Sequence, residues 1–423
     1  MRSCFFDVRT ALIVALICGL HSLSVQAEDW PRFRGPNGTG QSKAKGLPQE
    51  WTAEDYRWTQ KLAGSGSSAP VIWGDRLFVT SCDSETAEFF VECLDANTGE
   101  RAWKTRFASQ PYRIHRRNSY ASSTPAVDQD HVYVTYASPE HTYLVALNHQ
   151  GKEVWRRDFG RWVSQHGFGA SPMVYRDKVV LVNSQQAERL PADVQPGRSR
   201  VIAVDRLTGK DIWITELATT RANYSVPCVF SLDGRDQLIA CSTAEGFYSL
   251  DPETGQFNWK MPAFKMRTVA SPVLEGNLVL GSTGSGGGGN YLVAARLGDQ
   301  GAEKVFEVTQ AANYVPCPIV CNGLVFLFSD KGIASCVDPA SGEVVWKQRV
   351  AKGFSGSPVA SAEYVYVMDE SGDVLVLTAS REFQKPTINP LGESSRSTPA
   401  IANGCLFFRT DTQLFCLGNA TTD

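Results

Sequence analysis

The sequence has little of what marks most enzyme, membrane and nucleic-acid-binding classes. Its 423 residues include 41 Lys and Arg against 44 Asp and Glu, so no excess of positive charge favours nucleic acid as a partner. Charge runs and long amphipathic helical stretches are missing, which argues against disorder and against a helical bundle. No G-x-S-x-G, H-E-x-x-H or Cys-x-x-Cys-His motif occurs, and no two of the 11 cysteines are adjacent. The usual signals of serine hydrolases, zinc proteases and c-type haem proteins are therefore absent.

Only one apolar run is long enough to concern a membrane, at residues 11–20. It follows two arginines and precedes small residues at 25 and 27, a pattern typical of a secretory signal peptide and too short to span a bilayer. We predict a signal peptide over 1–27, an exported periplasmic or secreted chain, and no transmembrane segment after cleavage. A retained anchor is the alternative. The bulky Ile17 before Cys18 argues against lipoprotein processing.

A repeat runs along the rest of the chain. Each copy opens with Ser-Pro or Ser-x-Pro, continues through apolar strands and ends as in Leu250-Asp251, Thr254-Gly255 and Trp259. Successive openings lie between 40 residues (318 to 358) and 55 residues (70 to 125) apart, the length of one four-stranded propeller blade. The opening prolines are Pro70, Pro125, Pro172, Pro227, Pro272, Pro318, Pro358 and Pro399.

Eight openings predict an all-β fold, a single closed eight-bladed β-propeller of four-stranded antiparallel blades over residues 50–418. The last copy stops after three strands at Leu417, whereas Tyr56–Leu62 precedes the first opening as an orphan outer strand. We expect this N-terminal strand to close the last blade, because an open ring exposes two sheet edges. Residues 28–49 are predicted to form an extended arm on the ring, with a disordered tether as the alternative, and 419–423 a C-terminal tail.

The tryptophan that ends each copy has a predicted structural role. Thr-Gly makes the preceding turn, in which Gly takes positive φ, and the Trp ring should be buried against the neighbouring blade. Phe306 and Phe383 are expected to replace Trp in two copies. The predicted docking residues are Trp58, Trp103, Trp155, Trp213, Trp259 and Trp346.

The repeat resembles the tryptophan-docking motif of PQQ-type, quinoprotein-like eight-bladed β-propellers, over residues 58–417. The segments Asp29–Gly40 and His166–Pro172 are similar to a group of exported bacterial PQQ-like repeat proteins without a settled role. The resemblance implies the fold but leaves function open, because its members differ. Quinoprotein alcohol dehydrogenases use PQQ and Ca²⁺ beside an adjacent-cysteine disulfide that this chain lacks. The propeller lipoprotein of the outer-membrane barrel-assembly machinery is a non-enzymatic scaffold.

The cysteines give a weaker indication. In an exported chain, pairs on neighbouring predicted strands are candidates for disulfides. The alternative is that they are small buried residues. The candidate pairs are Cys82 with Cys93, Cys228 with Cys241, and Cys405 with Cys416.

Cations recur just before the openings, in the loops that ring the mouth of a propeller. Counting back three to nine residues from the opening proline reaches a cation in most copies, with aromatics between them. Such a cluster attracts anions, and Arg can hold a carboxylate or sulfate through two hydrogen bonds. The alternative is that these cations pair with nearby acids or lie in solvent. The predicted ligand-binding residues are Arg117, His166, Arg221, Tyr224, Arg267, Asn313, Lys352 and Arg396.

Two loops, 184–200 and 281–290, have the length of insertions, and such loops often carry recognition. We predict an exported, non-catalytic binding or scaffold module that uses the funnel rim for an anionic small molecule, a polysaccharide or an envelope protein. No catalytic or metal-binding residue is assigned, and no cofactor is expected. Two alternatives stay open: a PQQ-dependent, quinoprotein alcohol dehydrogenase-like oxidoreductase with Ca²⁺, and an outer-membrane protein assembly scaffold.

Overall fold

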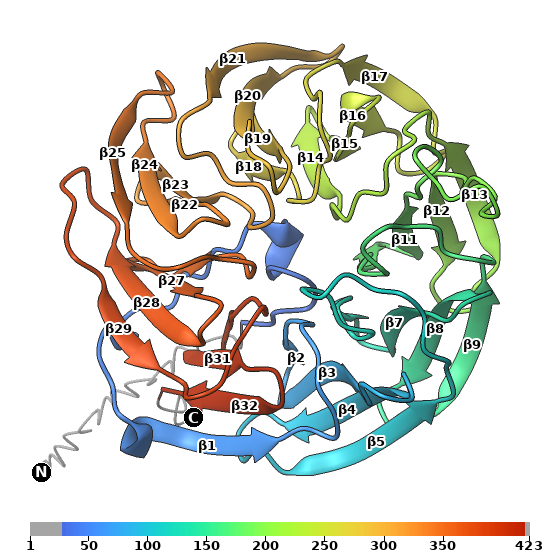
Figure 1. Cartoon of the computed structure of the whole chain (residues 1–423), viewed down its shortest axis with the longest axis horizontal. Helices are drawn as coiled ribbons and strands as arrows, with labels where there is room; N and C mark the ends of the chain where they lie inside the picture. Colours follow the sequence, from blue (N-terminus) through green and yellow to red (C-terminus); the bar gives the residue numbers. More distant parts are fainter. Residues whose placement is uncertain (1–27, 419–423) are drawn as a thin grey trace, which may run out of the picture.

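The fold is a ring of eight antiparallel sheets around a central axis (Figure 1). The computed structural model describes residues 28–418, so the predicted signal peptide at 1–27 and the tail at 419–423 lie outside the described residues. Within that range, 32 strands form eight four-stranded sheets, and helix is limited to the two 3₁₀ turns η1 (Pro36–Gly38) and η2 (Ala53–Asp55). The predicted eight-bladed propeller is confirmed.

Each blade runs from an innermost strand at the axis to an outermost strand at the rim. Blades 1 to 4 consist of β2 (Val71–Trp73), β3 (Arg76–Cys82), β4 (Phe89–Asp95) and β5 (Arg101–Phe107); β6 (Ala126–Val127), β7 (His131–Ala137), β8 (Thr142–Asn148) and β9 (Glu153–Asp158); β10 (Met173–Tyr175), β11 (Lys178–Asn183), β12 (Arg200–Asp205) and β13 (Asp211–Glu216); and β14 (Cys228–Leu232), β15 (Arg235–Ser242), β16 (Gly246–Leu250) and β17 (Phe257–Met261).

Blades 5 to 8 repeat this order, and the eighth takes its outermost strand from the N-terminal part of the chain. They consist of β18 (Val273–Glu275), β19 (Leu278–Thr283), β20 (Tyr291–Leu297) and β21 (Ala302–Val308); β22 (Ile319–Cys321), β23 (Leu324–Phe328), β24 (Ile333–Val337) and β25 (Val344–Arg349); β26 (Val359–Ala360), β27 (Tyr364–Met368), β28 (Asp373–Thr378) and β29 (Thr387–Pro390); and β30 (Ala400–Ala402), β31 (Cys405–Arg409), β32 (Gln413–Leu417) and β1 (Tyr56–Lys61).

The ring closes where β1 pairs with β32. Trp58 faces Cys416 and Thr59 faces Phe415 in an antiparallel ladder. The orphan strand predicted from the sequence thus occupies the outer edge of the last blade, which leaves no sheet open between the first and last blades.

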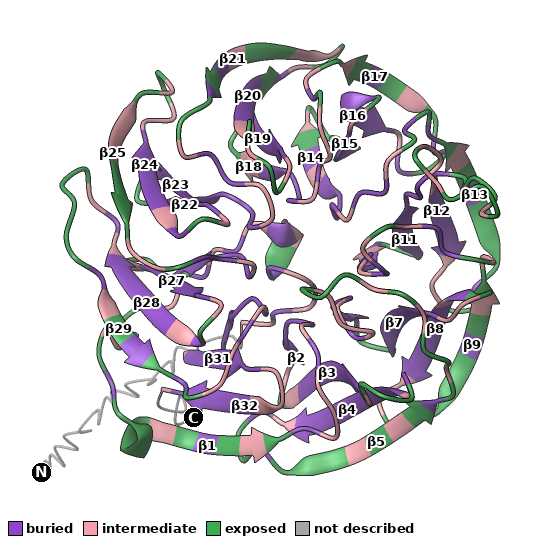
Figure 2. Ribbon diagram, in the orientation of Figure 1, coloured by how far each residue is buried: buried purple, intermediate pink, exposed green. Residues whose placement is uncertain are grey.

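Burial follows the distance from the axis. The middle strands are almost wholly buried, as in β7, whereas outermost strands such as β13 bury little besides their tryptophan (Figure 2). The middle strands pack against neighbouring blades on both faces, so both faces are mostly apolar, and the polar residues they do carry, such as Thr80 and Glu92, are buried.

Most of the predicted docking tryptophans join one blade to the next, whereas the indole of Trp259 donates to Gln237 Oε1 of its own blade at 2.9 Å. The indole N–H of Trp213 donates to the carbonyl oxygen of Pro252 at 3.0 Å, and its ring lies over Gly255, where a Cβ atom would stand 2.5 Å from the ring. Gly255 has a φ of +71°, so both the contact and the turn require glycine. Equivalent indole-to-carbonyl bonds, over an equivalent glycine, hold Trp58, Trp103 and Trp155.

The two expected replacements of tryptophan differ in outcome. Phe306 faces Ala294 as Trp213 faces Ala203, and it packs over Gly342. The expectation for Phe383 is wrong, because this residue precedes β29 in a connection without the tight Thr-Gly turn. It contacts Trp346 of the preceding blade instead, with ring centroids 5.2 Å apart.

The residue before each opening proline forms a ring of inter-blade hydrogen bonds. The backbone N–H of Cys317 donates to Ser357 Oγ at 3.0 Å, and that of Ser357 donates to Thr398 Oγ1 at 2.9 Å. Equivalent bonds run from Ala69 to Thr124, Thr124 to Ser171, Val226 to Ser271, and Ser271 to the Cys317 sulfur. The ring is interrupted where Val226 and Ala69 have no acceptor in their side chains. This explains why Ser, Thr or Cys precedes proline in most copies.

The N-terminal arm crosses the axis rather than following the rim. Trp30 bridges to Ile72 in blade 1, and Gln41 pairs with Ala360 in blade 7. Between them, η1 lies near the centre of the ring in Figure 1. The arm therefore connects innermost strands on two sides of the propeller.

One candidate disulfide is excluded by the strand register. Cys82 faces Phe89 and Cys93 faces Phe78, so the two thiols lie at opposite ends of the β3–β4 ladder. Four residues of strand separate them, roughly 13 Å at about 3.3 Å per residue, too far for a disulfide.

Candidate functional site

A cavity of about 540 Å³ lies on the propeller axis. Most of its wall comes from loops that join an outermost strand to the next innermost strand. The β11–β12, β19–β20 and β23–β24 loops and Phe33 of the arm also line it. Pockets of roughly 300–1,000 Å³ are typical of small-molecule sites. The cavity is thus the part of the described chain where many separate loops converge.

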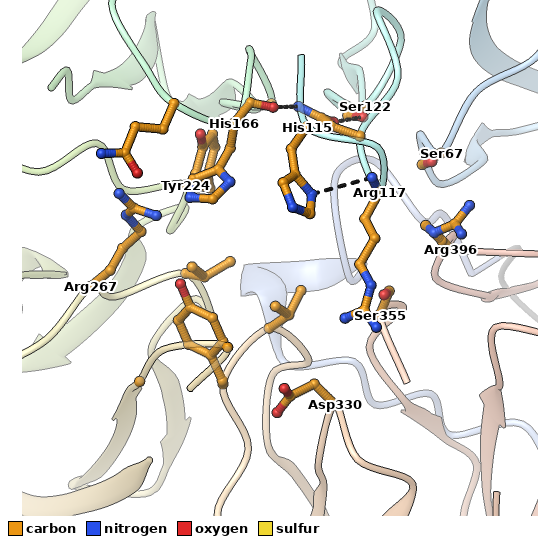
Figure 3. Close-up of a pocket in the computed structure, with 18 of the residues that line it drawn as sticks. Ser67, His115, Arg117, Ser122, His166, Tyr224, Arg267, Asp330, Ser355 and Arg396 are labelled. Atoms are coloured by element: carbon orange, nitrogen blue, oxygen red, sulfur yellow. Dashed lines mark hydrogen bonds between the residues drawn. The ribbon is translucent and has the colours of Figure 1, made fainter. Parts of the chain in front are cut away.

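Six of the eight predicted ligand-binding residues line this cavity, and they reach it from five different loops (Figure 3). They are Arg117, His166, Arg221, Tyr224, Arg267 and Arg396. Whether they bind a ligand stays a prediction, but the sequence spacing located the loops.

The other two predicted residues are placed elsewhere. Asn313 is completely buried, and its side-chain amide donates to Ser282 Oγ at 2.9 Å and to the Pro316 carbonyl at 2.6 Å. It holds the turn in which it lies. Lys352 is exposed and is not among the residues that line the cavity. Counting back from proline finds the loop but not the direction of each side chain.

The predicted arginines that line the cavity differ in whether a carboxylate lies close to them. Arg221 pairs with Glu188 at 2.6 Å, and Arg117 lies 3.7 Å from Glu370. Among residues 28–418, Arg267 and Arg396 have no carboxylate within 4 Å. Their Nε atoms are also buried without a hydrogen-bond partner. Arg267 and Arg396 therefore carry uncompensated positive charge.

The arm segment beside the cavity, residues 32–34 and called the floor below, also carries positive charge, although only Phe33 of this segment lines the cavity. Arg32 and Arg34 are 6% and 0% exposed and donate to the carbonyl oxygens of Pro227 and Pro318, each at 2.8 Å. Burial lowers the pKa of Arg32 to about 10 and lowers the pKa of Arg34 as well, yet guanidinium groups stay charged at neutral pH. These two charges add to the potential of the mouth.

The aromatic side of the cavity is neutral. Burial, then Arg267 and His115, lower the pKa of His166 to about 4. His166 therefore carries no charge at neutral pH. Burial raises the pKa of Tyr224 to about 12, and its hydroxyl already contacts Ser164 Oγ and the Gly167 carbonyl. A ligand in the cavity would therefore contact the ring of Tyr224 rather than its hydroxyl.

Sequence reasoning missed several lining residues. Glu188 and Arg189 come from the 184–200 loop, which had the length of an insertion but no repeat signal to place its side chains. His115 and Asp330 also line the cavity. His115 lies in the long β5–β6 connection, held by its backbone N–H bond to the His166 carbonyl at 3.2 Å.

The cavity does not match the requirements of PQQ with Ca²⁺. Within the described residues, no three His, Cys, Asp or Glu side chains are grouped so that they could hold a metal ion. Of the two acids that line the cavity, Glu188 is paired with Arg221, and Asp330 accepts from Asn290 at 3.3 Å. A hard cation such as Ca²⁺ needs six to eight oxygen ligands. We therefore derive no chemistry through this cofactor.

Fold and cavity together define a quinoprotein-like propeller with a cation-lined axial site. The family model described as outer membrane protein assembly factor BamB matches residues 87–348 and 330–422, and the chain belongs to this family.

The individual relatives are distant. The Escherichia coli K12 protein of that name is 23% identical over 301 residues, covering 68% of this chain and 71% of the relative. The BamB structure from Moraxella catarrhalis has a TM-score of 0.60 at 16% identity and covers 86% of this chain and 98% of its own. Quinohemoprotein alcohol dehydrogenase from Comamonas testosteroni has a TM-score of 0.64 at 14% identity, and the match covers 94% of this chain and 82% of that enzyme's chain. These structural likenesses show the fold.

No helix in the described part of the chain has both the length and the apolar character needed to cross a membrane. Enzymes and a non-enzymatic scaffold share this architecture, so function must be argued from the cavity itself.

Proposed function

We propose that this protein is an exported, non-catalytic binding module whose axial cavity takes an anionic ligand. The observation that carries the proposal is the pair Arg267 and Arg396, half-buried in the cavity wall without carboxylate partners. Placing guanidinium groups out of water is costly unless an opposite charge meets them. A bound anion would supply that charge.

The surroundings of the cavity favour a small anion over a reaction. Arg32 and Arg34 add fixed positive charge from below, and Tyr224 and Tyr314 provide apolar ring surface on one side. No activated nucleophile or acid–base pair is needed for this role. Charged groups on a rigid ring of loops suit recognition, because little ordering is required on binding.

Calorimetric titration of the secreted chain tests the proposal, with citrate and PQQ as probes, each with and without Ca²⁺. We expect saturable binding of both anions without a requirement for Ca²⁺, and roughly tenfold weaker binding to Arg267→Gln. The control is Arg235→Gln, which removes an exposed arginine outside the cavity. Absence of binding by either anion would reject the proposal. Binding that needs Ca²⁺ would favour the quinoprotein alternative.

The family match favours a second candidate, a scaffold for outer-membrane protein assembly. In that case the mouth would receive an acidic segment of an envelope protein. Deleting the gene should then lower the amounts of outer-membrane barrel proteins. Complementation with the native chain should restore them, whereas the Arg267→Gln/Arg396→Gln variant should not. Unchanged barrel proteins in the deletion strain would remove this candidate.

A further inference from the structure

The two arginines that have no carboxylate partner, Arg267 and Arg396, lie at separate places on the cavity wall. Arg267 lies in the connection between β17 and β18, at the junction of blades 4 and 5, and Arg396 in the connection between β29 and β30, at the junction of blades 7 and 8. Figure 3 shows them on two sides of the cavity, with His115 and Arg117 between them. A single carboxylate or sulfate at one of them would leave the other uncompensated.

Both arginines are presented by fixed backbone. The Arg267 carbonyl accepts from the backbone N–H of Gly284 at 3.0 Å, and its Nη2 donates to Gln186 Oε1 at 3.2 Å. Arg396 lies between two buried serines, of which Ser395 donates to the Arg409 carbonyl at 2.6 Å and Ser397 donates to the Ser68 carbonyl at 3.0 Å. Neither loop can swing its arginine across to the other, so the two anion positions are separate.

The other cations do not bridge these positions. Arg221, which also lines the cavity, is neutralised by an ion pair with Glu188 at 2.6 Å. Arg117 lies 3.7 Å from Glu370 and is exposed. Arg189, which also lines the cavity, is exposed at its edge. The uncompensated charge inside the wall is thus concentrated at two points.

The cavity lining mixes apolar side chains, such as Val269 and Val315, with polar groups and an acid. Ser122 and Ser355 line the cavity, and Asp330 lies there without a cationic partner among the described residues. A carboxylate in this position repels a third anionic group and favours a hydrogen-bond donor, such as a hydroxyl. A purely hydrocarbon middle would leave these groups unpaired.

From these observations we infer that the ligand is an elongated dianion, with an anionic group at each end and a hydroxyl-bearing middle. This inference rests on the proposed function and specifies its ligand class. One end binds at Arg267 and the other at Arg396, with the hydroxyls facing Asp330 and the serines. Short acidic oligosaccharides and hydroxylated dicarboxylates share this chemistry.

Calorimetry with matched probes tests the inference. Digalacturonate carries two carboxylates and a hydroxylated middle, galacturonate carries one carboxylate, maltose carries none, and the dicarboxylate mucate represents the non-glycosidic source. We expect digalacturonate or mucate to bind at least roughly tenfold more tightly than galacturonate, and maltose not to bind. Whichever dianion binds more tightly identifies the source of the ligand.

Variants separate this inference from the proposed function. Arg267→Gln and Arg396→Gln should each reduce the affinity for the dianion to that of galacturonate, whereas Arg235→Gln should leave it unchanged. Thermal unfolding of each variant checks that it is folded. If galacturonate binds as tightly as both dianions, or if Arg396→Gln changes nothing, the two-point inference is overturned while anion binding stands. If no anion binds at all, both fail.

Discussion

The floor and the mouth of the axial cavity use the same side chain for different purposes. At the floor, the guanidinium groups of Arg32 and Arg34 donate to backbone carbonyls of the inner ring. At the mouth, Arg267 bonds to two uncharged side chains, those of Gln186 and Tyr314, and the Arg396 side chain makes no hydrogen bond or ion pair to residues 28–418. Arginine bound to carbonyls fixes the arm to the propeller. Arginine without such partners is available for a ligand.

The largest expected effect is a loss of stability on replacing a floor arginine. Replacing Arg34 by Met removes the donors to the carbonyls of Gly38, Thr39 and Pro318 and leaves buried acceptors unpaired. We expect the free energy of unfolding to fall by about 2–4 kcal/mol, measured by urea denaturation. Arg267→Gln should change it by less than about 0.5 kcal/mol. Equal effects of the two variants would remove the distinction between floor and mouth.

The next largest expected effect is a loss of stability on breaking one of the inter-blade hydrogen bonds before an opening proline. Ser357→Ala removes the acceptor of the Cys317 backbone N–H, a bond of 3.0 Å. The buried donor is then unpaired, and we expect a loss of about 1–2 kcal/mol in the same assay. Val226→Thr is the matched opposite change, because it supplies an acceptor at one of the two interruptions. A stable Ser357→Ala protein would show that the ring of hydrogen bonds contributes nothing.

His166 makes the stability of the mouth depend on pH. Its pKa is about 4 in the folded chain against an ordinary 6.5, so the unfolded chain binds more protons between these values. The contribution of His166 to stability should therefore fall as the pH decreases from 6.5 to 4 and change little below that. Because His166 is only partly buried, we expect a loss of about 1 kcal/mol after allowing for solvent screening.

Urea denaturation at about pH 7 and about pH 4.5 measures this loss, with His166→Gln as the control that cannot titrate in this range. The native chain should lose more stability than the variant between the two conditions. Identical losses would mean that His166 is not held neutral by the fold.

The smallest predicted effect concerns the 184–200 loop. Glu188→Gln breaks the ion pair with Arg221 at 2.6 Å and frees a third cation at the mouth. We expect the affinity for citrate to rise by roughly threefold, because exposed ion pairs contribute little. Calorimetry against the native chain checks this, and weaker binding would indicate that Glu188 positions Arg221 rather than competing with the ligand.

The fold could be predicted from the sequence because the same strand pattern recurs eight times along the chain. The opening proline recurs in all eight copies and a Gly turn followed by tryptophan in five of them, and the missing strand of the last copy matched the orphan strand at Tyr56. The prediction failed at Phe383, where the connection before β29 has no Thr-Gly turn to set the register.

The site was less predictable. Repeat spacing located the loops of Arg267 and Arg396 but could not give side-chain direction, and Asn313 and Lys352, predicted by the same spacing, do not line the cavity. Glu188 belongs to a loop outside the repeat. Arg32 and Arg34 belong to an arm whose place on the axis depends on contacts with strands far along the chain.

We propose that the mouth arginines bind anions and that the floor arginines do not. A crystal structure of the protein grown with selenate tests this proposal, because selenium scatters anomalously and the ion resembles sulfate. We expect anomalous peaks at Arg267 and Arg396 and none at Arg32 or Arg34. A cavity without selenate, or selenate bound only at the exposed outer surface, would contradict it.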